Sequence, residues 1–347
     1  MQVTYVDEQL RKCIQKKVVT GHDLEAHVQP ASIDIPVGKQ AYLVKHTFLP
    51  FRQDVQSLVD ELCIQTVDLT KEVVLLKGHT YLFKCLKIDL PEGVSGRISP
   101  KSSIGRVDLL VRAVTDNSGL YDTISAGTTG EVWLTVTPQS FNVRIQPQTP
   151  LAQLRLFTQE PGTVTLPDPK DVLLETYNPE SNFVLDDNKI SLSLGGHRAE
   201  IVGYEARDTS EVLDLSKRDH DPNVFFREIR AAPRGDITLE KGHFYILATR
   251  ELIRVPKEYS VEMEASTPSV GELRVHYAGF FDPGFGEPSG ASGVLEIRPH
   301  ETLTVYEGQP ICMLEFFKNS QVPASLYGEA GNNYQGQRGP RLAKFFK

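Results

Sequence analysis

A short loop in the first half of the chain combines two hydroxyl side chains with two cations. The loop, "PKSSIGR" (100–106), carries Ser102 and Ser103 between Lys101 and Arg106, and apolar strand-like runs flank it. Hydroxyls donate hydrogen bonds to phosphate oxygens, and cations offset the negative charge of a phosphate group. The pattern therefore suits a phosphate-binding loop. On these residues alone, a solvated turn is the commoner explanation.

A strand in the second half carries a single carboxylate. In "GVLEI" (293–297) the alternation places Glu296 on the face opposite Leu295, and a loop that begins with Asp282 precedes this strand. A carboxylate in such a place is able to exchange protons with a bound group. The alternative is an outward, solvated glutamate on a half-exposed strand, and the alternation alone favours that alternative.

The C-terminal segment has a composition that suits hydrogen bonding more than packing. Residues 327–347 are rich in Gly, Asn and Gln, include Tyr334, Gln337 and Arg338, and show neither a strand nor a helix period. One interpretation is a lid that orders over a ligand. The other is a frayed chain terminus.

Three segments of the first half recur, in the same order, in the second half. Gly78 and Gly242 lie in matching "KGH" triplets, 164 positions apart. Chance similarity among strands explains one such recurrence, but hardly three. We therefore predict two copies of one domain, at 1–160 and 161–347, with the seam in the Pro-rich stretch 158–171. The recurring pairs are 33–38 with 190–195, 76–103 with 239–267, and 143–157 with 303–317.

The elements that position these residues are predicted to be strands. Short runs such as "EVWLTVTP" and "VLEIRP" alternate apolar and polar residues, and Gly, Pro, Asn and Asp separate them at close intervals. This pattern is typical of a mostly β protein, here two tandem β-barrel or jelly-roll domains. Helical spacing of apolar residues occurs at 6–17 and 54–63, so we expect few and short helices.

Composition limits the kinds of partner. The chain has 347 residues, a formal net charge of −8 and 24% charged residues, which argues against a non-specific binder of nucleic acid or of anionic membranes. The four cysteines form no CxxC pair, and no histidine begins an H-x-E triplet, so a zinc site is not expected. No apolar run reaches the roughly 18 residues of a membrane span, and the N-terminus lacks a signal-peptide core. We expect a cytoplasmic protein.

Together these motifs resemble those of the dCTP deaminases, which are relatives of the trimeric dUTPases. The resemblance covers almost the whole chain and implies a dUTPase-like fold in a double-length variant. One residue departs from the family motif, because Lys101 stands where that motif has arginine. The matching motifs are "SIDIPVG" (32–38), "PKSSIGR" (100–106), "AGFFDPGF" (278–285) with "GVLEI" (293–297), and "YQGQRGP" (334–340).

The resemblance also implies roles for individual residues. Glu296 falls on the catalytic glutamate, and Ser102 and Arg106 fall on residues that contact the nucleotide and the reacting water. Asp122 and Asp282 fall on the equivalent loops in which related dUTPases carry a water-activating aspartate, although bracing the loop as an Asx turn is the commoner role for such a residue. The remaining positions implied to bind nucleotide are Lys101, Ser103, Ala278, Tyr334, Gln337 and Arg338.

The two halves have diverged where the resemblance places chemistry. Thr135 stands in the first half where the second half has Glu296, and Glu272 stands in the second half where the first half has Arg106. Family sites lie between neighbouring barrels. We therefore hypothesise one working site that combines the first-half loop with the second-half glutamate.

The activity that the resemblance implies is zinc-free deamination of dCTP to dUTP and ammonia. Mg²⁺ would arrive bound to the substrate triphosphate, and a homo-oligomer with sites between barrels is expected. One alternative is a bifunctional enzyme that also cleaves dUTP and releases dUMP. Another is a nucleotide-sensing module without catalysis.

Overall fold

The computed structural model describes most of the chain. The described residues are 2–161, 167, 172–174, 189–195, 200–265, 273–275, 279–329 and 333–347. Two positions singled out in the sequence, Glu272 and Ala278, lie outside them, as does much of the predicted seam.

Strands dominate the first half, and the predicted helices are present. The amphipathic segment forms α1 (Asp7–Gln15), which buries Leu10 and Cys13, and the second predicted helix is α2 (Val55–Leu62). The first turn of α2 is fixed because the side chain of Asp54 accepts a 2.8 Å hydrogen bond from the backbone N–H of Ser57. The other elements are β1 (Gln2–Thr4), β2 (Val19–Thr20), η1 (Leu24–His27), β3 (Ile33–Pro36), β4 (Gln40–Val44), β5 (Cys63–Asp68), β6 (Val73–Leu75), β7 (Thr80–Asp89), β8 (Val94–Pro100), α3 (Ser102–Gly105), β9 (Leu109–Thr115), β10 (Thr123–Ile124), β11 (Thr129–Pro138), β12 (Asn142–Ile145) and β13 (Pro150–Gln159).

The second half is also built from strands, with one short helix among its described residues. Its elements are β14 (Leu173–Leu174), β15 (Lys189–Ser193), β16 (Ile201–Ala206), β17 (Val212–Asp214), α5 (Pro222–Phe225), β18 (Phe226–Arg230), β19 (Asp236–Leu239), β20 (Tyr245–Ile253), β21 (Tyr259–Ala265), β22 (Leu273–Val275), β23 (Phe280–Phe281), β24 (Ala291–Pro299), β25 (Leu303–Tyr306) and β26 (Pro310–Asn319). The prediction of a mostly β protein with few short helices is confirmed.

Matching turns in the two halves make matching hydrogen bonds. Gly78 and Gly242 have φ angles of +79° and +76°, in the left-handed region that glycine adopts without a steric penalty. The N–H of Gly78 donates to the Pro138 carbonyl at 2.8 Å, and that of Gly242 donates to the Pro299 carbonyl at 2.9 Å. The same local sequence thus produces the same turn before β7 and before β20, and each turn is hydrogen-bonded to the last residue of β11 or β24.

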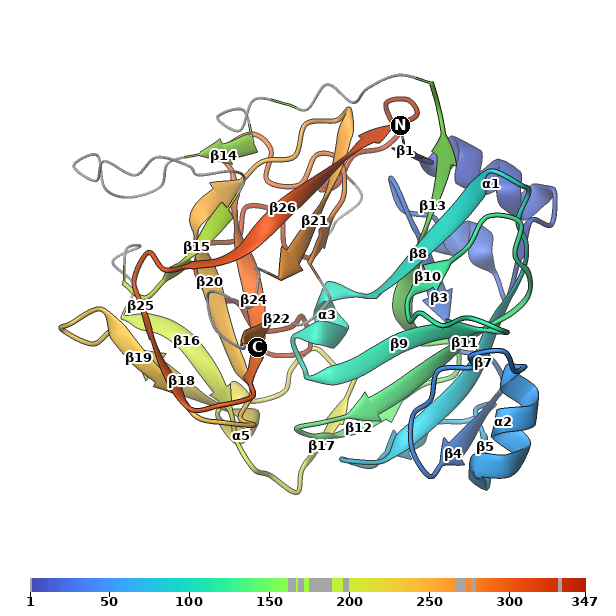
Figure 1. The fold of residues 1–347 in the computed structure, drawn as a ribbon. Coiled ribbons are helices and arrows are strands. Elements are labelled where there is room, and N and C mark those ends of the chain that lie inside the picture. Colours follow the sequence, from blue (N-terminus) through green and yellow to red (C-terminus); the bar gives the residue numbers. More distant parts are fainter. Residues whose placement is uncertain are drawn as a thin grey trace.

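The two halves are joined by shared strands and a shared core. β1 pairs antiparallel with β13 and parallel with β26, and β12 pairs parallel with β17, so sheets run from one half into the other (Figure 1). Near the C-terminus, the ring of Phe346 packs 5.4 Å from that of Phe226, and the ring of Phe141 in the first half lies 5.3 Å from that of Phe225. The shared packing holds the C-terminal segment against both halves. The predicted boundary at residue 160 stays a prediction.

Candidate active site

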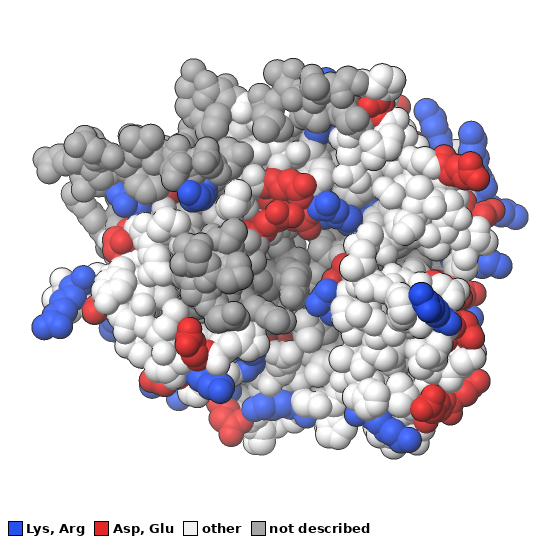
Figure 2. All heavy atoms as spheres, viewed as in Figure 1, with Lys and Arg blue, Asp and Glu red and all other residues white. Residues whose placement is uncertain are grey.

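A cavity of about 420 Å³ opens between the two halves. In Figure 1, α3 lies at the junction of the halves, close to the C-terminus. In Figure 2, acidic and basic side chains are interspersed over the drawn face, and the halves meet along a hollowed seam. The first half lines the cavity with Ala26, Val28, Gln29, Pro30, Asp34, Lys101, Ser102, Ser103, Arg106 and Gln153. The second half lines it with Phe280, Phe281, Asp282, Phe285, Ser325, Leu326, Tyr327, Asn333, Tyr334, Gln337 and Lys344.

The predicted phosphate loop forms α3, a single helical turn that follows β8. Lys101 precedes the turn, and Arg106 ends it with a 3.2 Å hydrogen bond from its N–H to the Ser102 carbonyl. This tight turn is what places Ser102, Ser103 and Arg106 together on the cavity wall. The side chains of Ser103 and Arg106 are buried, and Ser102 is half-buried.

Arg106 is buried beneath the C-terminal segment. Its guanidinium lies 3.8 Å from the centre of the Tyr334 ring, within the range of a cation–π contact. Its Nη1 donates hydrogen bonds to Gln337 Oε1 at 3.1 Å and to the Arg341 carbonyl at 3.0 Å. A first-half cation is thus held in one orientation by three residues of the second half.

Glu296, on β24, meets Arg106 across the junction. Its Oε1 lies 3.9 Å from Arg106 Nε, and the carboxyl is 2% exposed. Burial raises the pKa of Glu296 to about 8, although Arg106 opposes this rise. Among the described residues neither Glu296 Oε2 nor Arg106 Nε has a hydrogen-bond partner, so both atoms are able to bind an incoming polar group. Glu296 itself is not among the lining side chains, and Arg106 connects it to the cavity.

The buried carboxyl of Asp282 lines the cavity itself. Its Oδ1 accepts a hydrogen bond from the N–H of Ala31 at 3.2 Å. Burial, together with the nearby Asp34, raises the pKa of Asp282 to about 7, although the hydrogen bond from Ala31 and the charges of Lys101 and Arg155 oppose this rise. Lys101 in turn forms an ion pair with Asp34.

The C-terminal segment is packed against the site. Tyr334 is 5% exposed, its hydroxyl lies 2.7 Å from Ser103 Oγ, and it accepts a 3.1 Å hydrogen bond from the N–H of Lys344. Gln337 Nε2 donates to the Ser292 carbonyl on β24 at 2.7 Å. The same glutamine therefore bridges Arg106 to the strand that carries Glu296.

Comparison with known proteins identifies the family. The family model of the dCTP deaminase (DCD) N-terminal domain matches residues 3–160, and that of the C-terminal domain matches residues 170–346. This chain belongs to the 2′-deoxycytidine 5′-triphosphate deaminase family. The resemblance drawn from the four motifs is thereby confirmed.

Individual members of the dCTP deaminase family support this assignment. The crystal structure of 2′-deoxycytidine 5′-triphosphate deaminase from Agrobacterium tumefaciens superposes with a TM-score of 0.84 at 31% identity, over 93% of this chain and 99% of that chain. The likeness confirms the expected dUTPase-like fold. A protein of Kocuria rhizophila named "dCTP deaminase, dUMP-forming" is 33% identical over 34% of this chain, and the match spans about 62% of that relative's length. A protein of Coprothermobacter proteolyticus with the same name is 33% identical over 48% of this chain and 86% of its own length.

The structure brings together most of the site residues expected from the dCTP deaminase motifs. Lys101, Ser102, Ser103, Arg106, Asp282, Tyr334 and Gln337 all line the cavity. Arg338 does not line it. Its guanidinium donates to the Gly290 carbonyl at 2.7 Å and to the Ser289 carbonyl at 3.2 Å, so here it braces the loop before β24. Ala278 lies outside the described residues.

Two parts of the cavity were missed by the analysis of the sequence. Lys344 lines the cavity, and burial lowers its pKa, with Lys101 and Arg218 adding to the effect. Residues 26–30 supply the wall beside Asp282. The motif "SIDIPVG" contains Asp34 and was the one available signal for this wall. Lys344 lies outside every motif, and only the packing of the C-terminal segment brings it to the cavity.

The residues that the structure describes hold no cluster of three or more His, Cys, Asp or Glu side chains arranged to bind a metal ion. The exclusion of zinc stays a prediction. None of the helices among these residues combines the length and the apolar character needed to cross a membrane.

Proposed function

We propose that this chain deaminates dCTP in the cavity between its two halves. The observation that carries the proposal is the meeting of Arg106 and Glu296, 3.9 Å apart and both almost fully buried, across the junction. One half supplies the cation and the other supplies the carboxyl. A single chain therefore holds both groups that the family's reaction requires.

The proposed reaction adds water to C4 of cytosine and releases ammonia. Glu296 takes a proton from the attacking water and returns it to the departing amine. A carboxyl whose pKa is about 8 suits this task, because it gains and loses a proton near neutral pH. Arg106 orients the carboxylate, and Ser102 orients the water. No cofactor is consumed.

The triphosphate is proposed to lie along the cationic side of the cavity, with Mg²⁺ bound to its oxygens. Lys101 and Lys344 both line the cavity, and their mutual repulsion contributes to the lowered pKa of Lys344. An anionic ligand relieves this repulsion. The hydroxyls of Ser103 and Tyr334 lie beside each other and offer further hydrogen bonds to phosphate oxygens.

For the final product we favour dUMP over the dUTP expected at first from the sequence. The relatives from Kocuria rhizophila and Coprothermobacter proteolyticus are both named as dUMP-forming. Asp282 gives this chain a buried carboxyl on the cavity wall, in the loop where related dUTPases activate water. In this form of the proposal, the dUTP formed first stays bound and loses pyrophosphate.

The test is an ammonia-release assay with dCTP, after metals are stripped with EDTA and only Mg²⁺ is restored. Separation of the nucleotide products then distinguishes dUMP with pyrophosphate from dUTP. Turnover to dUMP supports the two-step form, and turnover to dUTP restores the simple deaminase. Binding of dCTP without ammonia release overturns the proposal in favour of a nucleotide-sensing module.

A further inference from the structure

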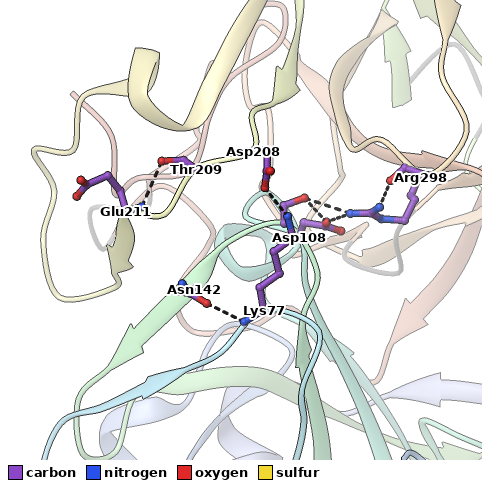
Figure 3. Close-up of polar contacts among 9 residues, drawn as sticks. Lys77, Asp108, Asn142, Asp208, Thr209, Glu211 and Arg298 are labelled. Atoms are coloured by element: carbon purple, nitrogen blue, oxygen red, sulfur yellow. Dashed lines mark hydrogen bonds and ion pairs between the residues drawn. The ribbon is translucent and has the colours of Figure 1, made fainter.

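A second ion pair joins the two halves two residues beyond the first. Asp108 lies two residues after Arg106, and Arg298 lies two residues after Glu296. Arg298 Nη2 forms a hydrogen-bonded ion pair with Asp108 Oδ2 (Figure 3). Because successive side chains of a strand alternate between faces, Glu296 and Arg298 project from the same face of β24. Two oppositely oriented charge pairs thus connect one turn to one strand.

Asp108 is held in place by contacts with its own half. It is fully buried, and its Oδ2 also accepts a 2.6 Å hydrogen bond from Ser140 Oγ. Its own N–H donates to the Gly105 carbonyl at 2.9 Å, which ties it to the helical turn. Its φ of 55° lies in the left-handed region, where Asp and Asn are the commonest residues after glycine. The carboxylate of Asp108 therefore has a fixed position relative to Arg106.

Arg298 is held from two sides. Its Nη1 donates to the Gly242 carbonyl of its own half, while its Nη2 contacts Asp108 and, at 3.1 Å, Ser140 Oγ of the other half. The planar guanidinium makes both sets of contacts in one geometry, which an ammonium group does not reproduce. Through Arg298, β24 is linked directly to the segment that follows the first-half turn.

The alternation of charges also favours one register. A shift of β24 by two residues in one direction would place Arg298 against Arg106, and a shift in the other direction would place Glu296 against Asp108. Either shift brings like charges together beside a buried partner, which is strongly unfavourable, so the pairs favour the arrangement in which Glu296 faces Arg106. The Arg106–Glu296 contact is itself loose, with 3.9 Å between the nearest atoms. Other contacts must therefore set the separation between Arg106 and Glu296.

We propose that Asp108 and Arg298 are positioning residues that set the separation between Arg106 and Glu296. The inference rests on the proposed function, since those two residues are the ones assigned to deamination. Neither Asp108 nor Arg298 lines the cavity. Their effect on the reaction is therefore exerted through Glu296, and substrate binding is largely independent of them.

The test compares Asp108→Asn, Arg298→Gln and Arg298→Lys in the full chain. Asn keeps the shape of Asp108 and tolerates its backbone conformation. For Asp108→Asn and Arg298→Gln we expect kcat to fall by roughly 10- to 100-fold, the scale on which a small misplacement of catalytic groups acts. The Kd of dCTP, measured by calorimetry, should stay within about threefold of the wild-type value, because loss of transition-state positioning lowers kcat without weakening binding. Arg298→Lys keeps the charge and should recover part of the loss.

Lys77 and Asp208 offer a matched control. Their ion pair, 2.9 Å long, also joins the two halves and lies in the same view, but Asp208 is almost fully exposed (Figure 3). Asp208→Asn should leave kcat unchanged because an exposed pair contributes little. The kcat of the double variant Asp108→Asn/Arg298→Gln should be no lower than that of the less active single variant, since the same interaction is removed in each case.

The outcomes separate this inference from the proposed function. If the wild type deaminates dCTP and Asp108→Asn or Arg298→Gln keeps full kcat, the positioning role is wrong while the function stands. A parallel loss of kcat and dCTP affinity indicates a general structural defect and also overturns the positioning role. If the wild type does not deaminate, crystal structures decide. A distance from Arg106 Nε to Glu296 Oε1 that is unchanged in Arg298→Gln overturns the inference, and a longer one supports it.

Discussion

Strands β11 and β24 occupy equivalent places in the two halves but carry different residues at one position. Thr135 on β11 pairs with Leu82, and Glu296 on β24 pairs with Ile246. Both side chains are buried. The Thr135 hydroxyl donates a 3.3 Å hydrogen bond to the Arg112 carbonyl, so it is satisfied within its own sheet. Glu296, in contrast, faces a cation from the other half.

The loops that carry Asp122 and Asp282 also differ in whether the side chain is bonded within its own half. Asp122 forms an ion pair with Arg112 and accepts a 2.6 Å hydrogen bond from the N–H of Ala113, and burial raises its pKa to about 6. Asp282 lines the cavity, and its pKa is raised to about 7. One aspartate braces a turn, whereas the other faces the space available to a ligand.

These differences show that the scaffold and the chemistry are separable. The fold accommodates either a hydroxyl or a carboxyl on the equivalent strand, and either a paired or a cavity-facing aspartate in the equivalent loop. In the proposed function each half supplies only part of the site, so one complete site requires both halves.

The largest effect is expected for Glu296→Gln. The amide keeps the shape of the side chain and removes the proton acceptor, so ammonia release should fall by about 10²- to 10⁴-fold. Calorimetry should still detect dCTP binding, since the amide keeps the shape of the side chain. Residual turnover above about a tenth of the wild-type kcat would remove Glu296 from its assigned role.

Thr135 supplies the matched control for this variant. Thr135→Val removes the hydroxyl at the equivalent position and should leave kcat within about twofold, because that hydroxyl bonds only within the sheet in the described structure. Ammonia release is again the measurement. A loss comparable to that of Glu296→Gln would show that the first-half strand also takes part in catalysis.

The two aspartates give the second comparison. Asp282→Asn should lower pyrophosphate release from dUTP by roughly 100-fold, within the range for loss of a general base, and should affect deamination much less. Asp122→Asn should leave both rates within about threefold, although it should destabilise the fold by about 1–3 kcal/mol because Arg112 loses a half-buried partner. Equal loss of pyrophosphate release in both variants would contradict the assignment of Asp282.

Lys344 tests the cationic wall. Lys344→Met keeps most of the side-chain volume and removes the charge, so KM for dCTP should rise by about 5- to 10-fold with little change in kcat, as expected for loss of a contact made to the ground state and transition state alike. Steady-state kinetics at fixed Mg²⁺ provide the measurement. An unchanged KM would place the triphosphate elsewhere.

Local sequence patterns predicted much of the fold and part of the candidate site. Helix α1 was predictable from apolar spacing, and Arg106 and Glu296 were predictable as partners because each half lacked one of them. Lys344 was not predictable, because its approach to Lys101 depends on the packing of Phe346 into a core shared by both halves. The ion pair between Asp108 and Arg298 was missed for a similar reason, since it links residues 190 positions apart and neither belongs to a motif.

The smallest effect concerns stability, and it again separates Glu296 from Thr135. The pKa of Glu296 is about 8 in the folded protein and 4.5 as its ordinary value. Between these pH values the unfolded chain has lost the proton while the folded protein keeps it, so the contribution of Glu296 to stability falls as pH rises, by about 1.4 kcal/mol per pH unit at most. Glutamine does not titrate.

The melting temperature of Glu296→Gln relative to wild type should therefore rise by a few degrees from pH 5 to pH 8 and level off above it. Thr135→Val should show no such pH-dependent difference, and Asp282 titrates equally in all three proteins. Thermal denaturation at several pH values provides the measurement. A difference that is flat across this range would mean that Glu296 is ionised well below pH 8, and its proton exchange would then not be matched to neutral pH.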